Sequence, residues 1–423
     1  MDSFPKEVSA GEAVKAIESG SRVFLEHPCA EPFPLVEALL EGRERLRNVA
    51  VFMAASPDHT LLAQKGLEPH FRLALAIVGD GTREAVEQGR ADHIPVRWFE
   101  IPRLFAPGGA FPLDVALIQV SPPDQNGFVS LGVIVDCALP AARSARIVIA
   151  EVNEKMPRTL GNSFLHLSEI HYMVRSSRPI PTLPPPKIGD AERAIAKYVA
   201  QLVPDGATLE FGIGTMPEAI LQGLAGKKEL GIHSGTLGDG IVDLVANGAV
   251  TNSRKRIDQG KMVTGGLRGT EKLYHFADNN ALLEMQPVTY THDPMVISQL
   301  DSFVAINSAV EIDLTGQVNA ESLGEMQISG VGGQGDWVRG ALLSRGGKSI
   351  IATTSTAGHG RVSRIVPRLK PGAVVTTPRY DVHYFVTEYG IAELWGKTVS
   401  QRAEALVSVA HPDFREGLRH SRE

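Results

Sequence analysis

The sequence predicts an α/β fold made of two tandem domains of similar topology with mainly parallel sheets. Segments of strand length alternate with segments of helical pattern, which is typical of βαβ units and a parallel sheet. Residues 114–120 are almost continuously apolar, as expected of a strand that is covered on both faces. The second half of the chain also repeats the order of the first at an offset of about 190 residues.

The repeat is weak letter by letter, but it keeps its order. The matched segments are residues 20–25 with 205–210, 114–118 with 303–306, and 147–150 with 349–352. Between the halves, residues 179–186 contain five prolines, and such a stretch neither pairs in a sheet nor continues a helix. We therefore expect an extended linker, with one domain over residues 1–185 and a second over residues 186–423.

Local patterns predict the elements of each half. Ser9 is a candidate helix N-cap, and Glu12 completes a capping box. Residues 71–78 are mostly apolar, and their pattern assigns them to neither a helix nor a strand. In the first half we predict helices at 9–19, 35–41 and 84–88, and strands at 22–25, 48–54, 114–120 and 145–152. In the second half we predict a helix at 190–203 and strands at 303–306 and 349–352.

Composition limits the classes of function. The chain has 423 residues, a net charge of −6 and 6% aromatic residues, so it lacks the basic surface of a nucleic-acid-binding protein. Its two cysteines, Cys29 and Cys137, predict buried thiols in a reducing compartment. No signal-peptide pattern is recognisable, and no apolar run reaches the roughly 18 residues of a membrane helix. We expect a cytoplasmic protein without nucleic-acid or membrane partners.

Residues 330–336 form a glycine-rich segment with four glycines in six positions. Glycine leaves the backbone bare and permits positive φ, so such a loop can present N–H groups to a carbonyl oxygen, an oxyanion or a phosphate. A second pair, Gly346-Gly347, leads to Lys348 and an apolar strand. One pair alone would indicate a tight turn between strands, whereas two clusters ending on a lysine favour a ligand loop.

Residues 210–220 have the pattern of a strand, a glycine turn and a helix start. Pro217 and Glu218 suit the first helical turn. The N–H groups of residues 213–216 would favour an anion or a carbonyl oxygen above the helix. The turn is only a GxG and lacks the third glycine of a dinucleotide fingerprint. A ligand turn and a purely structural turn are equally supported at this point.

Other polar residues form no recognisable catalytic set. His233 and Ser234 are neighbours on a predicted strand, where their side chains point to opposite faces, so we expect His233 to be packed and hydrogen-bonded. Glu388 ends an apolar stretch and suits either a helix start or a site. The thirteen histidines are scattered without metal-ligand spacing, and we expect no metal.

Eight segments together resemble the acetyl-CoA hydrolase/transferase family, a group of family I CoA-transferases that includes enzymes for 4-hydroxybutyrate and acetate. The segments are SPPDQNGFVSLG (121–132), NEKMPRTLG (153–161), GIGTMP (212–217), GQVNAESLG (316–324), SGVGGQGDWVRGA (329–341), SRIVP (363–367), VTEYGIAELWGK (386–397) and AHPDFRE (410–416). The resemblance implies two NagB/RpiA/CoA-transferase-like domains and a homodimer. It also implies a CoA thioester as substrate and no permanently bound cofactor.

In that family a glutamate attacks the thioester, and CoA passes through an enzyme-bound glutamyl thioester to a second carboxylate. The resemblance implies that backbone amides of the glycine turns stabilise the tetrahedral oxyanions and that Glu388 lies at the reacting end. The implied CoA-binding residues are Gly212, Ile213, Gly214, Thr215, Met216, Val310, Gly332 and Gly333, and the glycine-rich segment adds Lys348.

The chain departs from the family at the nucleophile. The family's segment His-Ser-Glu-Met-x-x-Asp-Gly is His-Ser-Gly-Thr-Leu-Gly-Asp-Gly at residues 233–240, so Gly235 takes the glutamate's position and cannot form an anhydride. Glu210 stands where relatives usually carry glutamine. Two hypotheses are open: Glu210 supplies a carboxylate to the emptied site, as base or nucleophile, or it is a hydrogen-bonding residue behind that site.

Three functions are compatible with these residues. The first is an acyl-CoA transferase with an altered route, or a hydrolase, with acyl-CoA and a small carboxylate or water as reactants. The second is an inactive relative that binds CoA or acyl-CoA without a glutamyl-CoA intermediate. The third, a nicotinamide-dependent oxidoreductase, depends on the incomplete GxG turn alone. We expect the first.

Overall fold

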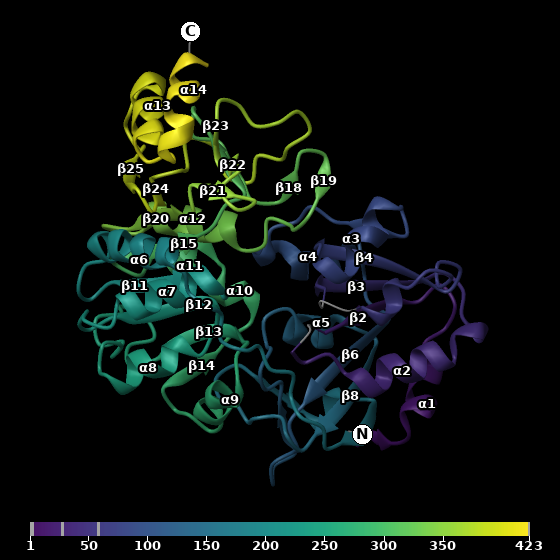
Figure 1. Cartoon of the computed structure of the whole chain (residues 1–423). Coiled ribbons are helices and arrows are strands. Elements are labelled where there is room, and N and C mark those ends of the chain that lie inside the picture. Colours follow the sequence, from purple (N-terminus) through teal and green to yellow (C-terminus); the bar gives the residue numbers. More distant parts are fainter. Residues whose placement is uncertain (1–3, 27–28, 57–59, 422–423) are drawn as a thin grey trace. The chain divides into compact units, whose positions relative to one another are not determined.

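The computed structural model describes residues 4–26, 29–56 and 60–421, in which two sheets of eight strands form the frame (Figure 1). The first sheet has the order β1-β10-β8-β6-β2-β3-β4-β5, and its described pairings are all parallel. The second has the order β14-β13-β12-β11-β15-β20-β24-β25, with β24 and β25 antiparallel. These sheets confirm the predicted α/β class.

The first half of the chain supplies the first sheet and the helices around it. The strands of this sheet are β1 (Lys6–Glu7), β2 (Arg22–Leu25), β3 (Val49–Ala55), β4 (Phe71–Ile77), β5 (Ala91–His93), β6 (Val115–Val120), β8 (Ile147–Asn153) and β10 (Tyr172–Ser176). The helices are α1 (Ala10–Ala13), α2 (Phe33–Glu41), α3 (Asp80–Glu87), α4 (Ile101–Phe105) and α5 (Ala138–Ser144). A small antiparallel ribbon joins β7 (Phe128–Ser130) to β9 (Phe164–His166).

The second half supplies the second sheet. Its strands are β11 (Thr208–Phe211), β12 (Gly231–Leu237), β13 (Met262–Leu267), β14 (Leu283–Met285), β15 (Phe303–Asn307), β20 (Lys348–Ala352), β24 (Tyr384–Thr387) and β25 (Gly390–Glu393). The helices are α6 (Asp190–Leu202), α7 (Thr215–Gly223), α8 (Gly240–Ala246), α9 (Glu271–Ala277), α10 (Val288–Thr291), α11 (Pro294–Ile297), α12 (Gln334–Leu343), α13 (Val399–Ser408) and α14 (Pro412–His420). Short strands between residues 311 and 366 form three further small sheets.

The predicted duplication is confirmed by strand order. One sheet contains the run β5-β4-β3-β2-β6-β8-β10, and the other contains β14-β13-β12-β11-β15-β20-β24. Within each of these seven-strand runs, the first strand in the sequence is central, the next three strands extend outward to one edge, and the last three fill the other side. The three pairs of segments matched in the sequence are strands in equivalent places of the two sheets: β2 corresponds to β11, β6 to β15, and β8 to β20. Only the outermost strand differs, since β1 is parallel and β25 is antiparallel.

Most predicted elements are present, with two corrections. The helix predicted at 9–19 ends at Ala13, followed by a 3-10 turn at Val14–Ala16, because Ile17 is already extended. The loop predicted at 330–336 is shorter, because α12 starts at Gln334 and takes in the last glycine. The stretch 71–78, which the sequence pattern leaves unassigned, contains β4 (Phe71–Ile77), which lies in the sheet between β3 and β5.

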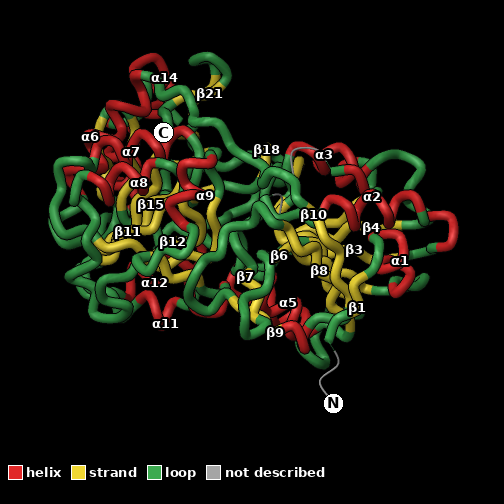
Figure 2. Tube along the Cα trace, turned by 90° about the horizontal axis from the view of Figure 1, so that it is seen from below, coloured by secondary structure: helices red, strands yellow, loops and turns green. Residues whose placement is uncertain are grey.

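The chain forms two compact units. The first comprises Met1–Leu183, Gly265–Tyr290 and Ile328–Gly332, and the second comprises Pro184–Thr264, Thr291–Gln327 and Gly333–Glu423. Within each unit the strands, yellow in Figure 2, lie among helices drawn in red. Residues 177–189, which include the predicted linker, form neither helix nor strand.

Candidate active site

The glycine turn at residues 212–214 lies at the carboxyl ends of two neighbouring parallel strands. Phe211 ends β11 and is paired with Ile306 of β15, and Asn307 is the last residue of β15. Gly214 has φ +113°, in the region that favours glycine, and precedes the first helical residue, Thr215. Ligands of α/β sheets bind outside the carboxyl ends of the strands, so this edge is the candidate site.

A pocket of about 280 Å³ opens at this edge. It is lined by Gly212, Ile213, Thr215, Met216, Pro217, Ile220, Ile306, Asn307 and Ser308. Four of the five residues predicted from the glycine turn are in that lining. The first N–H groups of a helix have no partner within the helix, and the dipole there favours negative charge. The start of α7 therefore suits a carbonyl oxygen or an oxyanion in this pocket.

Glu210 is buried directly behind the pocket. Its Oε2 accepts hydrogen bonds from the Ile306 N–H at 3.2 Å and from Asn307 Nδ2 at 3.1 Å. Burial raises the pKa of Glu210 to about 8, although both hydrogen bonds act to lower it. The carboxyl group is therefore mostly protonated at neutral pH. Glu210 is absent from the pocket lining, whereas Asn307 is part of it, so this geometry supports the hypothesis of a hydrogen-bonding residue behind the site.

Gly235 lies at the same edge, on the neighbouring strand β12. The β11–β12 register pairs Leu209 with Ile232, and its continuation brings Gly235 level with Gly212. Ser234 joins the two strands there, because its Oγ donates to the Phe211 carbonyl at 2.8 Å. The position at which the resemblance implies a nucleophile is therefore next to the glycine turn.

His233 precedes these residues on β12 and is buried in the sheet. Its Nε2 lies 2.9 Å from the Thr291 carbonyl oxygen. Burial, with the positive charge of Lys255 as a second cause, lowers the pKa of His233 to about 3. This confirms the prediction of a packed, hydrogen-bonded histidine.

The remaining predicted residues are distributed more widely. Glu388 follows β24, and its carboxylate accepts from the Ser355 N–H at 2.8 Å and from Ser355 Oγ at 2.6 Å. Val310 follows β15, and its N–H donates to Asn319 O at 2.8 Å. Both follow the carboxyl end of a strand in the second sheet, as the pocket does.

Gly333 is the N-cap of α12, while Gly332 belongs to the first unit, where its carbonyl accepts from the Trp98 N–H at 2.9 Å. Lys348 is the first residue of β20, at its amino end, and its Nζ donates to Leu202 O at 2.7 Å. The pocket is at the carboxyl end of the neighbouring strand β15, so the structure does not bring Lys348 to it.

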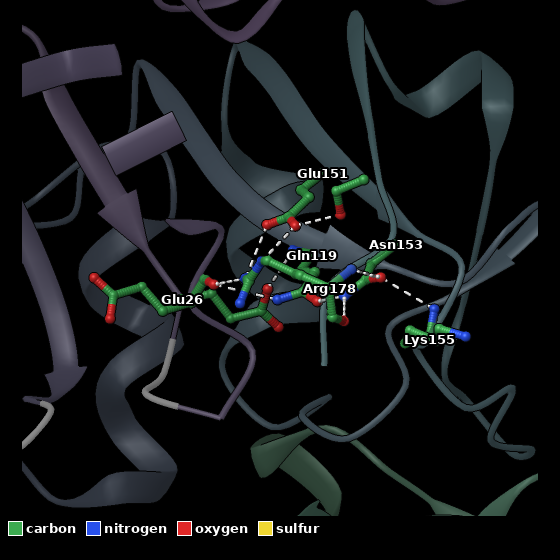
Figure 3. Close-up of polar contacts among 8 residues, drawn as sticks. Glu26, Gln119, Glu151, Asn153, Lys155 and Arg178 are labelled. Carbon is green, nitrogen blue, oxygen red and sulfur yellow. Dashed lines mark hydrogen bonds and ion pairs between the residues drawn. The ribbon is translucent and has the colours of Figure 1, made fainter. Parts of the chain in front are cut away.

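Sequence reasoning missed a buried charged network in the first unit (Figure 3). Glu151 of β8 is fully buried, and its carboxylate accepts from Arg178 Nε at 2.7 Å and Nη2 at 3.0 Å. Asn153 Nδ2 donates to Gln119 Oε1 at 2.8 Å, and the Gln119 N–H donates to Glu26 Oε2 at 2.6 Å. Glu26, Gln119 and the two β8 residues lie near the carboxyl ends of β2, β6 and β8, and Arg178 follows the carboxyl end of β10. The available signal was a polar residue near the end of each apolar run.

Burial in and beside this network shifts the protonation of two carboxyl groups, those of Glu26 and Glu31. The pKa of Glu26 is raised well above its usual value, first by burial and then by the charges of Asp136 and Glu151, against the hydrogen bond from Gln119. Burial also raises the pKa of Glu31 to about 7, although Arg178 opposes the shift. Arg178 thus offsets only part of the cost of burying several carboxyl groups together.

Other classes of site have no counterpart in the described parts of the chain. In residues 4–26, 29–56 and 60–421, no three His, Cys, Asp or Glu side chains are grouped to hold a metal ion. None of the described helices has the length and apolarity needed to cross a membrane. The side chains of Cys29 and Cys137 are both buried, as predicted.

Comparison with known proteins covers nearly the whole chain. The acetyl-CoA hydrolase/transferase N-terminal domain matches residues 2–184, and the corresponding C-terminal domain matches residues 269–422. The chain is 50% identical to a 4-hydroxybutyrate coenzyme A transferase of Clostridium kluyveri, covering 98% of this chain and 96% of the relative. It is 41% identical to a succinyl-CoA:cyclohexane-1-carboxylate CoA transferase of Geobacter metallireducens, covering 97% and 93%. The crystal structure of RipA from Yersinia pestis superposes with a TM-score of 0.92 at 37% identity, covering 98% and 96%.

Proposed function

Because the chain belongs to the acetyl-CoA hydrolase/transferase family, we propose that it moves CoA from the thioester of a short carboxylic acid to a second acceptor at the β11–β15 edge. The chain is an enzyme of acyl-CoA metabolism, a transferase or a hydrolase. A protein that only binds CoA is not favoured, because the relatives with high identity are CoA-transferases. The incomplete GxG turn no longer supports a nicotinamide enzyme.

The pocket at the start of α7 carries this proposal. A thioester carbonyl placed there would meet N–H groups of the turn that are not used within the helix. These donors stabilise the oxyanion that forms when the carbonyl carbon is attacked, and loss of one such donor typically lowers kcat by about 10²–10³-fold. Asn307 is a second polar group in the lining, and Glu210 fixes the orientation of its amide.

The lining also indicates the type of acyl group. None of its residues carries a charged side chain, and several are apolar, including Ile213, Met216 and Ile220. An uncharged short chain, or one with a terminal hydroxyl, is compatible with such a pocket, whereas a second carboxylate would be buried without a cation. We therefore propose a short monocarboxylic acid such as 4-hydroxybutyrate, butyrate or acetate as the donor acid.

Two further properties belong to the proposal. The two buried cysteines, Cys29 and Cys137, are compatible with a reducing compartment and hence with a cytoplasmic location. The family resemblance supports a homodimer, which light scattering of the purified protein would measure directly. CoA is a substrate in this proposal rather than a resident cofactor.

The proposal is tested by filling the pocket from its backbone. In Gly212→Val, the new Cβ would have Pro217 Cγ at 4.0 Å as its nearest neighbour, so the fold accepts the change while the side chain enters the pocket. We expect the wild-type enzyme to turn over 4-hydroxybutyryl-, butyryl- or acetyl-CoA. We expect the Gly212→Val variant to bind the same CoA ester at least tenfold more weakly and to keep the Tm of the wild type.

The control is Gly226→Val, at an exposed glycine with no atom within 4 Å of an added Cβ. This variant should keep the activity of the wild type. Unaltered kcat and KM in Gly212→Val would contradict the assignment of the pocket. Absence of any affinity of the wild type for CoA esters would contradict the function itself.

A further inference from the structure

Two aromatic rings lie next to the end of β12. His292 follows α10, and Trp337 is the fourth residue of α12; their ring centroids are 4.3 Å apart. Both side chains are nearly completely buried, with exposed fractions of 4% and 3%. We refer to them as the ring pair. No sequence pattern suggested it, because its members are 45 positions apart.

The ring pair takes the space in front of Gly235. A Cβ atom built on Gly235 would lie 3.0 Å from both Cε1 and Nε2 of His292, and 3.5 Å from Cζ2 of Trp337. Optimal separations between non-bonded carbon atoms are about 3.5–4.0 Å. A side chain at position 235 would therefore point toward the imidazole of His292. A side chain longer than alanine's would have to occupy space that the imidazole already fills.

The imidazole has little freedom to move away. A Cβ atom on Gly333 would lie only 2.5 Å from Cδ2 and 2.6 Å from Nε2 of the same ring, so the start of α12 leaves no room for a side chain beside the adjacent edge of the imidazole. On the remaining side, Nδ1 lies 2.8 Å from Thr291 Oγ1. Two glycine backbones and one hydrogen bond thus fix the ring in place.

The ring pair offers no charge that would compensate a carboxylate. Burial is the main cause that lowers the pKa of His292 well below its usual value, and the neighbouring His233 is the second cause. The imidazole is therefore neutral at neutral pH. A glutamate introduced at position 235, which is itself partly buried, would be crowded, and its carboxylate would contact uncharged rings in place of water, which is costly for an ionised group.

We propose that the ring pair closes the nucleophile position and commits this enzyme to a route in which neither the acyl group nor CoA is bonded to the protein. This inference rests on the proposed function, since it specifies how the same CoA thioester reacts. The acceptor itself then attacks the thioester carbonyl carbon, with the start of α7 as the oxyanion site.

The chemistry balances without an enzyme nucleophile. A carboxylate oxygen of the acceptor bonds to the thioester carbon, the C–S bond breaks, and CoA thiolate and a mixed anhydride of the two acids result. The thiolate then attacks the other anhydride carbonyl, the C–O bond breaks, and the new thioester and the donor carboxylate form. With water as acceptor, its oxygen bonds to the carbon, the C–S bond breaks, and its proton passes to the thiolate.

The test restores the missing carboxylate with and without the ring. Wild type, Gly235→Glu, His292→Ala and the double variant Gly235→Glu/His292→Ala are incubated with butyryl-CoA and analysed by intact mass spectrometry, before and after hydroxylamine. For the wild type we expect no adduct and, in two-substrate kinetics, intersecting lines. We expect a lowered Tm and no adduct in Gly235→Glu. In the double variant we expect a partly restored Tm and at least tenfold more of a hydroxylamine-sensitive CoA adduct.

Gly226→Glu is the matched control, because it makes the same change at an exposed glycine and should leave Tm and kinetics unchanged. A CoA adduct on the wild type, or parallel lines in its kinetics, would overturn the inference while leaving the proposed function intact. Equal adduct formation by Gly235→Glu and the double variant would also overturn it. If Gly235→Glu does not fold, the two-substrate kinetics and the intact mass of the wild-type enzyme still test the inference. A wild type without affinity for CoA esters would instead refute the proposed function.

Discussion

At the scale of single residues, Glu210 connects the pocket to pH. Its carboxyl group supports Asn307 from a fully enclosed position, where a neutral acid costs less than a carboxylate. A glutamine in its place would keep a carbonyl oxygen for the same two donors and lose only the titration. The difference between these residues is therefore a difference in how stability depends on pH.

We predict that Glu210→Gln makes the protein more stable than wild type in alkaline solution. The folded-state pKa of Glu210, about 8, is above its ordinary value of 4.5. Its favourable contribution is therefore complete below about pH 4.5 and is lost as the pH rises through about 8. The stability of the variant relative to wild type should increase over this range by about 5 kcal/mol, since one pKa unit corresponds to about 1.4 kcal/mol; urea unfolding at each pH measures it.

The control for this prediction is Glu87→Gln, because Glu87 is exposed at the end of α3. Its stability relative to wild type should be nearly independent of pH. If Glu210→Gln behaves in the same way as this control, the carboxyl group of Glu210 titrates normally and the protonation argued above is wrong.

The sequence identified only part of the site. The turn at 212–216 was predictable because a strand, two glycines and a helix start are local signals. The ring pair was not predictable, since His292, Trp337 and Gly235 meet only after the strands are in place. Lys348 was a reasonable candidate by composition, but its position at the amino end of β20 directs it to Leu202 instead.

At the scale of elements, the two sheets use their carboxyl edges differently. The second sheet carries a bare turn and a pocket between β11 and β15. The corresponding edge between β2 and β6 of the first sheet carries Glu26 and Gln119, with Glu151 opposite Gln119 on β8. A buried charge network is weak evidence for stability, but removal of one member leaves its partner buried and uncompensated.

We predict that Arg178→Met destabilises the protein by about 3 kcal/mol. The side chain of Glu151 is fully buried, while that of Arg178 is 24% exposed and contacts it through two nitrogens. Loss of the guanidinium leaves the carboxylate without its counter-ion. Glu151→Gln combined with Arg178→Met should cost less than Arg178→Met alone, since the unpaired charge is then gone; chemical unfolding measures both.

Arg175→Met is the comparison within the same unit, because Arg175 forms an exposed ion pair with Glu7. Surface pairs contribute about 0–1 kcal/mol, so this variant should stay close to wild type. Equal effects of the two arginine substitutions would show that burial of Glu151 does not control the outcome.

Element prediction succeeded where the pattern was local and failed where packing decided. The strands β2, β3, β6 and β8 follow from runs of apolar residues. The first helix was overestimated because its capping box specifies a start and not an end; Ile17 turns into the core beyond it. At α12, glycine content suggested a loop, but Trp337 and Val338 are buried in a helix that begins at Gln334.

At the scale of the whole molecule, duplication of one strand order describes the architecture better than a division of the chain into two continuous domains at residue 185. The shared strand order was detectable from three matched segments, because sheets of this type preserve the order of strands and helices along the chain. The sequence did not reveal that short segments of the second half belong to the first unit. Residues 265–290 and 328–332 lie in the second half of the sequence and belong to the first unit, although nothing in their composition marks them.

We predict that residues 1–185 do not fold when expressed alone. In the intact chain, the Val135 N–H donates to Gly265 O and the Leu267 N–H to Val133 O, both at 2.8 Å. Asn162 makes a similar bond to Met285 at 2.8 Å. The fragment lacks these partners, so backbone groups and apolar side chains of the first unit would be left uncovered. Circular dichroism on heating should show no cooperative transition.

The decisive control is the full chain cleaved after folding at a protease site inserted near residue 185, which breaks the connection but keeps every segment. We expect this cleaved protein to melt cooperatively and to elute as one complex in gel filtration. Co-expression of residues 1–185 and 186–423 should give the same complex, because the second fragment brings the missing segments. A cooperative transition of residues 1–185 alone would show that the first unit does not require residues 265–290 and 328–332.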